Sequence, residues 1–166
     1  VHWTADNIRL TGFRVLGAWL ISGLLANGEN WLTLATALDS PGSVQWSTSN
    51  VLPFVGRADP GAKGGSSAYI NVPRGESSWL EATVMGPGTF DFWLREVDGH
   101  PLNGSPWSYW ALTIDGVPVP MSGTSWPAIS ITGEGEHRIR FTFTNPTYNL
   151  LGDLASSVDE VSWAPL

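Results

Sequence analysis

The strictest constraint on the fold is a two-residue periodicity in the stretch EATVMGPGTFDFWLREVD, which runs from Glu81 to Asp98. Gly86-Pro87-Gly88 predicts a turn, and the residues after it alternate between apolar and polar. One side of this segment is apolar throughout, and the other carries Asp91, Trp93 and Arg95. Such a period is typical of a β-strand with one face buried and the other in water.

Comparable short strands, separated by turn signals, are predicted along most of the chain. Asp115-Gly116 is a hairpin signal, Glu134-Gly135-Glu136 predicts another turn, and residues 56–67 predict a long exposed loop. The chain has 19 Gly, 12 Pro and only 14% charged residues, against about 25% in ordinary soluble domains. We therefore predict an all-β fold over residues 31–166: a two-sheet antiparallel β-sandwich of the jelly-roll type.

Charge and composition exclude several classes of function. A net charge of −7 offers nothing to neutralise phosphates, so we expect no nucleic-acid partner. The absence of cysteine removes disulfides, thiolate metal sites and cysteine nucleophiles. No sequence motif of a serine hydrolase, zinc peptidase or phosphate-binding loop is present. Glu81 and Asp91 are the one candidate pair of glycosidase carboxylates, and we expect no enzymatic activity.

Residues 1–30 differ from the rest and form an apolar N-terminal segment. Its central stretch, Phe13 to Leu25, is shorter than the roughly 20 apolar residues that a membrane-spanning helix requires. Two interpretations stay open: the segment completes its own sandwich, or it docks on a neighbouring subunit by strand addition. The chain begins at Val1 rather than Met, which fits either a leader removed on secretion or a trimmed chain.

Ten tryptophans are more than one core of this size needs, so we expect some of them to contact a ligand or a partner. Sugars stack their C–H face on an aromatic ring while polar side chains bind the hydroxyls. Asp91, Trp93 and Arg95 are therefore predicted to bind a glycan, with Trp107 and Tyr109 beside them. The alternative is that Trp93 packs under a loop and Asp91 forms a surface ion pair with Arg95.

Several short motifs follow one another in the order of a known group of domains. They are Ser78-Trp79-Leu80-Glu81, Gly86-Pro87-Gly88-Thr89-Phe90, Phe92-Trp93, Ile114-Asp115-Gly116, Ser122-Gly123, Trp126, Gly135-Glu136-His137 and Val158 to Trp163. This order resembles the lectin-like jelly-roll domains of secreted bacterial hydrolases and surface proteins, including carbohydrate-binding modules and cleaved-adhesin domains. The resemblance implies a jelly roll, an extracellular location, no catalysis and a structural calcium ion bound by Asp159.

Hard oxygen ligands for calcium are predicted near the C-terminus, where Asp153 and Asp159 stand with Glu160. The alternative for Asp159 is that its carboxylate caps a turn. His137 lies on the apolar side of its predicted strand and is expected to be a hydrogen-bonded core histidine rather than a metal ligand.

Two functions are consistent with these patterns. The first is a secreted, non-catalytic carbohydrate-binding domain in which a glycan stacks on Trp93. The second is a structural subunit of an extracellular filament or surface layer that self-assembles through residues 1–30. Neither function requires a membrane span.

Overall fold

The computed structural model describes residues 31–96, 109–120, 128–147 and 152–166. The apolar N-terminal segment, residues 1–30, lies outside them. Nine strands and one short helix, α1 (Leu34–Ala37), make up the described part, which is mostly β as the sequence predicts. Within it, no helix has the length and apolar character needed to cross a membrane.

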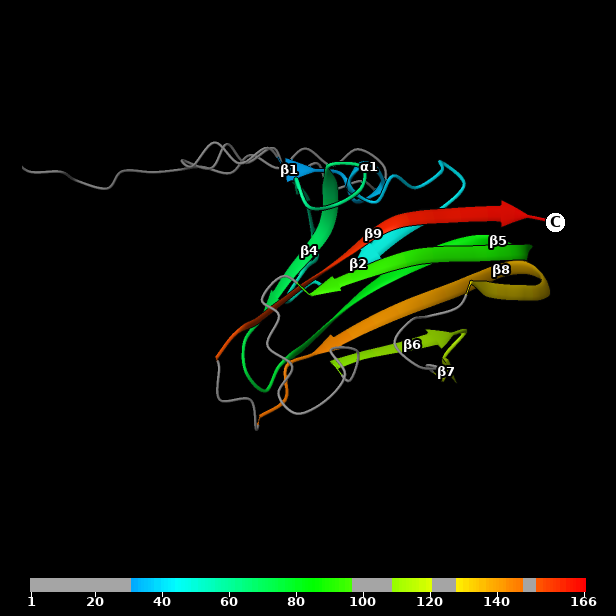
Figure 1. The fold of residues 1–166 in the computed structure, drawn as a ribbon. Helices are drawn as coiled ribbons and strands as arrows, with labels where there is room; N and C mark the ends of the chain where they lie inside the picture. Colours follow the sequence, from blue (N-terminus) through cyan, green and yellow to red (C-terminus); the bar gives the residue numbers. More distant parts are fainter. Residues whose placement is uncertain (1–30, 97–108, 121–127, 148–151) are drawn as a thin grey trace, which may run out of the picture.

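All paired strands are antiparallel and belong to one continuous hydrogen-bonded network (Figure 1). Their order is β1-β3-β4-β9-β5-β8-β6-β7, and β2 pairs with β5 beside this path. The strands are β1 (Trp31–Leu32), β2 (Gln45–Thr48), β3 (Val55–Ala58), β4 (Ser66–Val72), β5 (Ser77–Glu96), β6 (Trp110–Ile114), β7 (Val117–Val119), β8 (Ile129–Thr144) and β9 (Leu154–Pro165).

Strand β5 connects the two parts of this network. Its first half lies between β2 and β8, whereas its second half, from Gly88 to Glu96, pairs with β9. The predicted alternation holds in both halves: Leu80, Ala82 and Val84 are buried in the first, and Phe90, Phe92 and Leu94 in the second. The strands therefore surround one core, in keeping with an all-β sandwich.

β5 and β8 each continue through the turns predicted at Gly86-Pro87-Gly88 and Glu134-Gly135-Glu136, and the paired strands bend back on themselves there (Figure 1). The predicted chain reversal at Gly86-Pro87-Gly88 is therefore confirmed: Phe92, in the second half of β5, packs against Phe141, which is opposite Leu80 in the first half. At this bend the glycines in β5 also permit close backbone approach. A Cβ at Gly86 would lie 2.6 Å from the carbonyl oxygen of Gly133, and one at Gly88 would lie 2.4 Å from the Trp163 ring. The predicted Asp115-Gly116 hairpin turn does join β6 to β7, with φ of 51° and 80° at its two residues.

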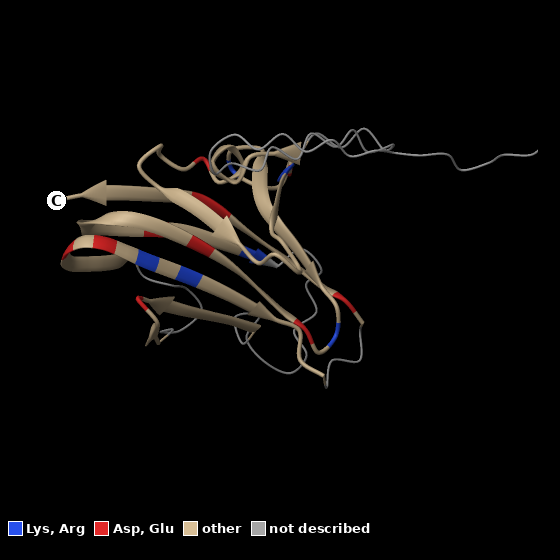
Figure 2. Ribbon diagram, turned by 180° about the vertical axis from the view of Figure 1, so that it is seen from behind, with Lys and Arg blue, Asp and Glu red and all other residues tan. Residues whose placement is uncertain are grey.

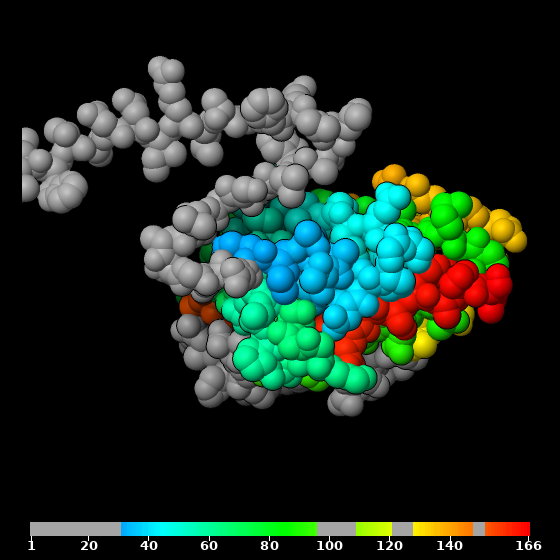
Figure 3. Space-filling model, turned by 90° about the horizontal axis from the view of Figure 1, so that it is seen from above, coloured from blue at the N-terminus to red at the C-terminus, as the bar shows by residue number. Residues whose placement is uncertain are grey.

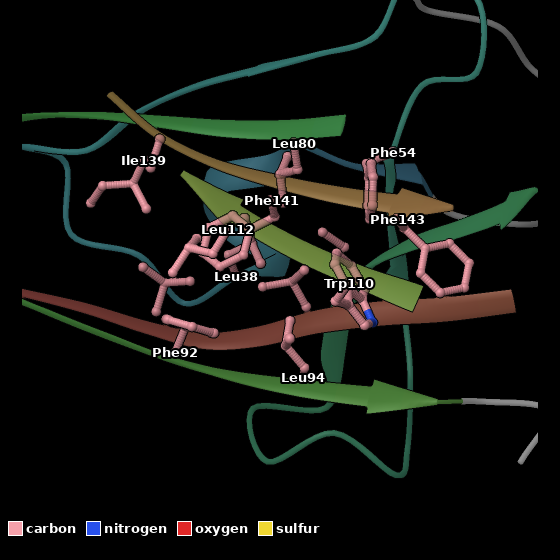
Figure 4. Close-up of a cluster of buried hydrophobic side chains, with 14 of the residues drawn as sticks. Leu38, Phe54, Leu80, Phe92, Leu94, Trp110, Leu112, Ile139, Phe141 and Phe143 are labelled. Atoms are coloured by element: carbon pink, nitrogen blue, oxygen red, sulfur yellow. The ribbon is translucent and has the colours of Figure 1, made fainter. Parts of the chain in front are cut away.

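The core is rich in aromatic rings that meet at tilted or edge-on angles (Figure 4). Phe141 packs edge-on against Phe92 with ring centroids 4.7 Å apart, and Trp110 packs against Phe143 at 4.9 Å. Leu38, just after α1, is fully buried in the same cluster. Each large apolar side chain buried here contributes about 1.5–3 kcal/mol, so this cluster is the main source of stability.

Candidate functional site

Trp93 lies on the outer face of β5, on the side opposite the buried Phe92 and Leu94. Its relative exposure is 43%, and Asp91 on the same face is also exposed. Of the six tryptophans in the described ranges, only Trp110 and Trp163 are buried in the core. The predicted direction of the Asp91, Trp93 and Arg95 side chains is therefore confirmed, and so is the expectation that not every tryptophan is core.

A β-bulge in β9 sets the polar residues beside this face. Asp91 is opposite Ser162 and Trp93 is opposite Asp159. Phe92, a single residue of β5, is therefore opposite two residues of β9, Glu160 and Val161. Glu160 accommodates the extra residue with a left-handed φ of 50°. The bulge restores Val161 and Trp163 to the core side, while Ser162 remains exposed next to Asp91.

The loop of residues 59–65 is held against the outer face beside Trp93 (Figure 3, teal beside the red β9). Asp159 is fully buried, and its two carboxylate oxygens accept hydrogen bonds from the backbone N–H groups of Lys63, at 3.1 Å, and Glu160, at 2.7 Å. The Lys63 side chain forms an ion pair with Glu160 at 2.9 Å. The predicted long exposed loop is thus shorter than expected and partly buried, since Asp59 and Ala62 are both covered.

Arg95 does not pair with Asp91. Its guanidinium binds Asp59 at 3.2 Å, and Asp59 also accepts hydrogen bonds from the Ser67 hydroxyl and the Gly61 N–H. Burial alone raises the pKa of Asp59, but these hydrogen bonds and the positive charges of Arg95 and Arg57 together hold it below its usual value. Arg95 is therefore a loop anchor, whereas Asp91 accepts a bond from the Phe92 N–H at 2.9 Å.

The two predicted calcium ligands are not brought together. Asp153 is an exposed residue just before β9, whereas Asp159 is buried six residues further on. Six residues of extended strand span about 20 Å, too far for one ion to bind both carboxylates. No group of three or more histidine, aspartate or glutamate side chains suited to a metal occurs in the described ranges. Asp159 accepts bonds from two backbone N–H groups, as in the capping alternative, and calcium binding by this residue stays a prediction.

The remaining residues singled out from the sequence are Trp107, Tyr109 and His137. Trp107 lies outside the described residues. Tyr109 was expected beside Trp93, but it precedes β6, is only 7% exposed and packs edge-on against Phe143, so that expectation is corrected. His137 is hydrogen-bonded as predicted, through Nδ1 to Asp115 at 2.7 Å and Nε2 to the Gly133 carbonyl at 3.1 Å, although it is half-buried rather than in the core.

Sequence reasoning missed the loop anchors Asp59 and Lys63, which lie far from Trp93 in the sequence. A signal for one of them was present: Asp59 begins the sequence Asp-Pro-Gly, which favours a turn closed by the aspartate side chain. The observed hydrogen bond from the Gly61 N–H to Asp59 is that turn. Nothing local indicated that the far end of the loop would reach Asp159.

Comparison with known proteins adds no assignment: no family model, curated protein or solved structure matches this chain. The function must therefore be argued from the residues themselves.

Proposed function

We propose that this chain is a non-catalytic, extracellular carbohydrate-binding domain of jelly-roll type, in which a glycan stacks on Trp93. The observation that supports this most is the 43% exposure of the Trp93 ring on an otherwise polar outer face. An indole left in water forgoes the favourable burial of a large apolar surface, and sugar-binding surfaces use such rings as stacking platforms. The resemblance to lectin-like domains supports the same class of function and the extracellular location.

The surroundings of Trp93 suit a hydroxyl-rich ligand. The exposed side chains of Asp91 and Ser162 stand directly opposite each other on β5 and β9, next to the ring. The Lys63–Glu160 ion pair adds a donor from the loop of residues 59–65 and an acceptor from β9. The backbone beneath is held by β9 and by the loop anchored through Asp159, so a ligand need not order it on binding.

Binding is favoured over glycoside hydrolysis by the placement of the two candidate carboxylates. Glu81 and Asp91 lie in the two halves of β5, on the outer sides of two layers that pack against each other through Phe92 and Phe141. Packed sheets are about 10 Å apart, so two carboxylates on their outer faces are farther apart than that. Glycosidases hold their two carboxylates within about 5–9.5 Å of each other. Glu81 is moreover engaged in an ion pair with Arg140 at 2.8 Å.

The test is a comparison of Trp93→Ala with Trp31→Ala by calorimetric titration against a panel of plant, algal and host polysaccharides. Trp31 is a matched control, because its ring is 41% exposed but lies on β1, away from β5 and β9. Trp93→Ala should lose about 1–3 kcal/mol of binding free energy while Trp31→Ala binds like the wild type. No binding by the wild-type protein, or equal binding by both variants, would contradict the proposal.

The alternative, a filament or surface-layer subunit, depends on residues 1–30, and no observation on the described residues favours it. Gel filtration separates the two functions. A clean monomer of 17.9 kDa agrees with a binding domain, and open-ended polymers agree with a filament.

A further inference from the structure

A second polar face lies on the other half of the network, over β2, the first half of β5, β8 and β6. Ser47, Glu81, Arg140 and Thr113 face one another in one row across these four strands. The row beside it contains Trp79, Thr142 and Ala111. The apolar partners on these strands point into the core, so the two rows form the outer surface of the sheet.

Arg140 is fixed at the centre of this face by two contacts. Its Nε donates a 2.8 Å hydrogen bond to Glu81, and its guanidinium carbon lies 4.4 Å from the centroid of the Trp79 ring. Glu81 is only 8% exposed, so its carboxylate requires this partner to offset the loss of water. These contacts distinguish Arg140 from a flexible surface arginine, whose ion pairs contribute little.

Among the described residues, no hydrogen-bond partner reaches the terminal nitrogens of Arg140. Its side chain is 42% exposed, and in the described part of the chain only its Nε carries a side-chain hydrogen bond. A guanidinium already held by a carboxylate and an indole loses little conformational freedom when these remaining donors bind a ligand.

The neighbours of Arg140 indicate what kind of ligand fits. They are small and carry hydroxyls: Thr83, Thr113 and Thr142 are half-buried and Ser47 is exposed. Both arginines of β8 are paired with carboxylates, because Arg140 pairs with Glu81 and Arg138 pairs with Glu136 (Figure 2). Glu134 on the same strand and Asp115 beside Arg138 add further negative charge. A surface with paired arginines, an excess of carboxylates and several hydroxyls matches an uncharged, hydroxyl-rich chain better than an anion.

We infer that the face around Arg140 is a second saccharide-binding site, separate from the one at Trp93. The choice of ligand class rests on the proposed function, whereas the location rests on the fixed guanidinium. A chain with two such sites engages a polysaccharide at two points, or links two polysaccharide chains, and so gains avidity without further contacts.

The test is calorimetric titration of neutral gluco-, xylo- and manno-oligosaccharides into four proteins: wild type, Trp93→Ala, Arg140→Gln and the double variant. Two sites are expected in the wild type, one in each single variant and none in the double variant. Because Arg140→Gln leaves a buried Glu81 unpaired, Thr113→Val with Thr142→Val provides a second variant that removes two hydroxyls at nearly constant shape. This double threonine variant should bind saccharide at the Arg140 face about tenfold more weakly, with an unchanged melting temperature.

The possible results separate the two claims. One site that Trp93→Ala abolishes, and that neither the Arg140 nor the threonine substitutions affect, overturns this inference and leaves the proposed function standing. Binding that requires Arg140 but not Trp93 supports this inference and removes the Trp93 site. No binding of any saccharide by the wild type overturns both.

Discussion

Replacing Asp159 with alanine removes a fully buried carboxylate that holds both the bulge in β9 and the loop beside Trp93. Two backbone N–H groups, those of Lys63 and Glu160, lose a charged acceptor. Hydrogen bonds to charged groups contribute about 1.5–3 kcal/mol each, so Asp159→Ala should lower the free energy of unfolding by about 3–6 kcal/mol. Asp159→Asn retains one acceptor oxygen and should lose about half as much.

Urea unfolding followed by circular dichroism measures these changes. Asp91→Asn is the matched control, because Asp91 is exposed and accepts one bond from the adjacent Phe92 N–H, so its cost should stay below about 1 kcal/mol. If Asp159→Ala costs no more than Asp91→Asn, the reasoning about the loop is refuted. Urea unfolding curves recorded with calcium and with a chelator test whether a calcium ion is bound. If calcium stabilises the wild type but not Asp159→Asn, Asp159 is a calcium ligand instead of a cap.

Three further predictions concern stability. The pKa of Asp59 is lowered in the folded state, so its stabilisation is present above its unfolded pKa of about 4 and is lost as pH falls through the folded value. The pKa of His137 is raised by its hydrogen bonds to Asp115 and the Gly133 carbonyl. Its stabilisation is present below about pH 6.5 and is lost as pH rises through the folded value. Melting temperatures of wild type, Asp59→Asn and His137→Gln are compared across pH. The loss of stability at falling pH should disappear in Asp59→Asn, and the loss at rising pH should disappear in His137→Gln. A pH dependence that is unchanged in both variants would refute the assignments. Phe141→Ala should cost about 3–5 kcal/mol in urea unfolding, because its ring is buried among Phe90 and Phe92, and a loss below about 1 kcal/mol would contradict that packing. If residues 1–28 complete their own sandwich, their deletion should expose core surface and cause disordered aggregation in gel filtration. If they serve a neighbour, the truncated protein should stay a folded monomer that binds an added peptide of residues 1–28, and a soluble, glycan-binding monomer that ignores the peptide would contradict both interpretations.

The strand faces could be predicted from the sequence because alternation is a local property. The buried side of β5 and the outward direction of Asp91 and Trp93 follow from a period of two residues. The reversal at Gly86-Pro87-Gly88 could be predicted because glycine and proline mark turns locally, whereas the close approach of the Gly133 backbone could not, because it is remote in sequence. Tyr109 was misplaced because it precedes β6, where the alternation does not yet apply.

The candidate site was harder to predict, because its contacts join distant segments. Arg95 pairs with Asp59, 36 residues away, rather than with the nearby Asp91. Asp159 accepts a bond from Lys63, 96 residues away. No local pattern encodes such pairings, although the Asp-Pro-Gly sequence at Asp59 did indicate one of the turns involved.

The central claim is that a glycan stacks on the exposed ring of Trp93. The most direct measurement is the indole N–H resonances of the ten tryptophans during titration with a bound oligosaccharide, with the Trp93 signal assigned from Trp93→Phe. The account predicts that the Trp93 resonance shifts in a saturable way while those of the buried Trp110 and Trp163 stay in place. A saturating titration that leaves Trp93 unmoved would contradict it.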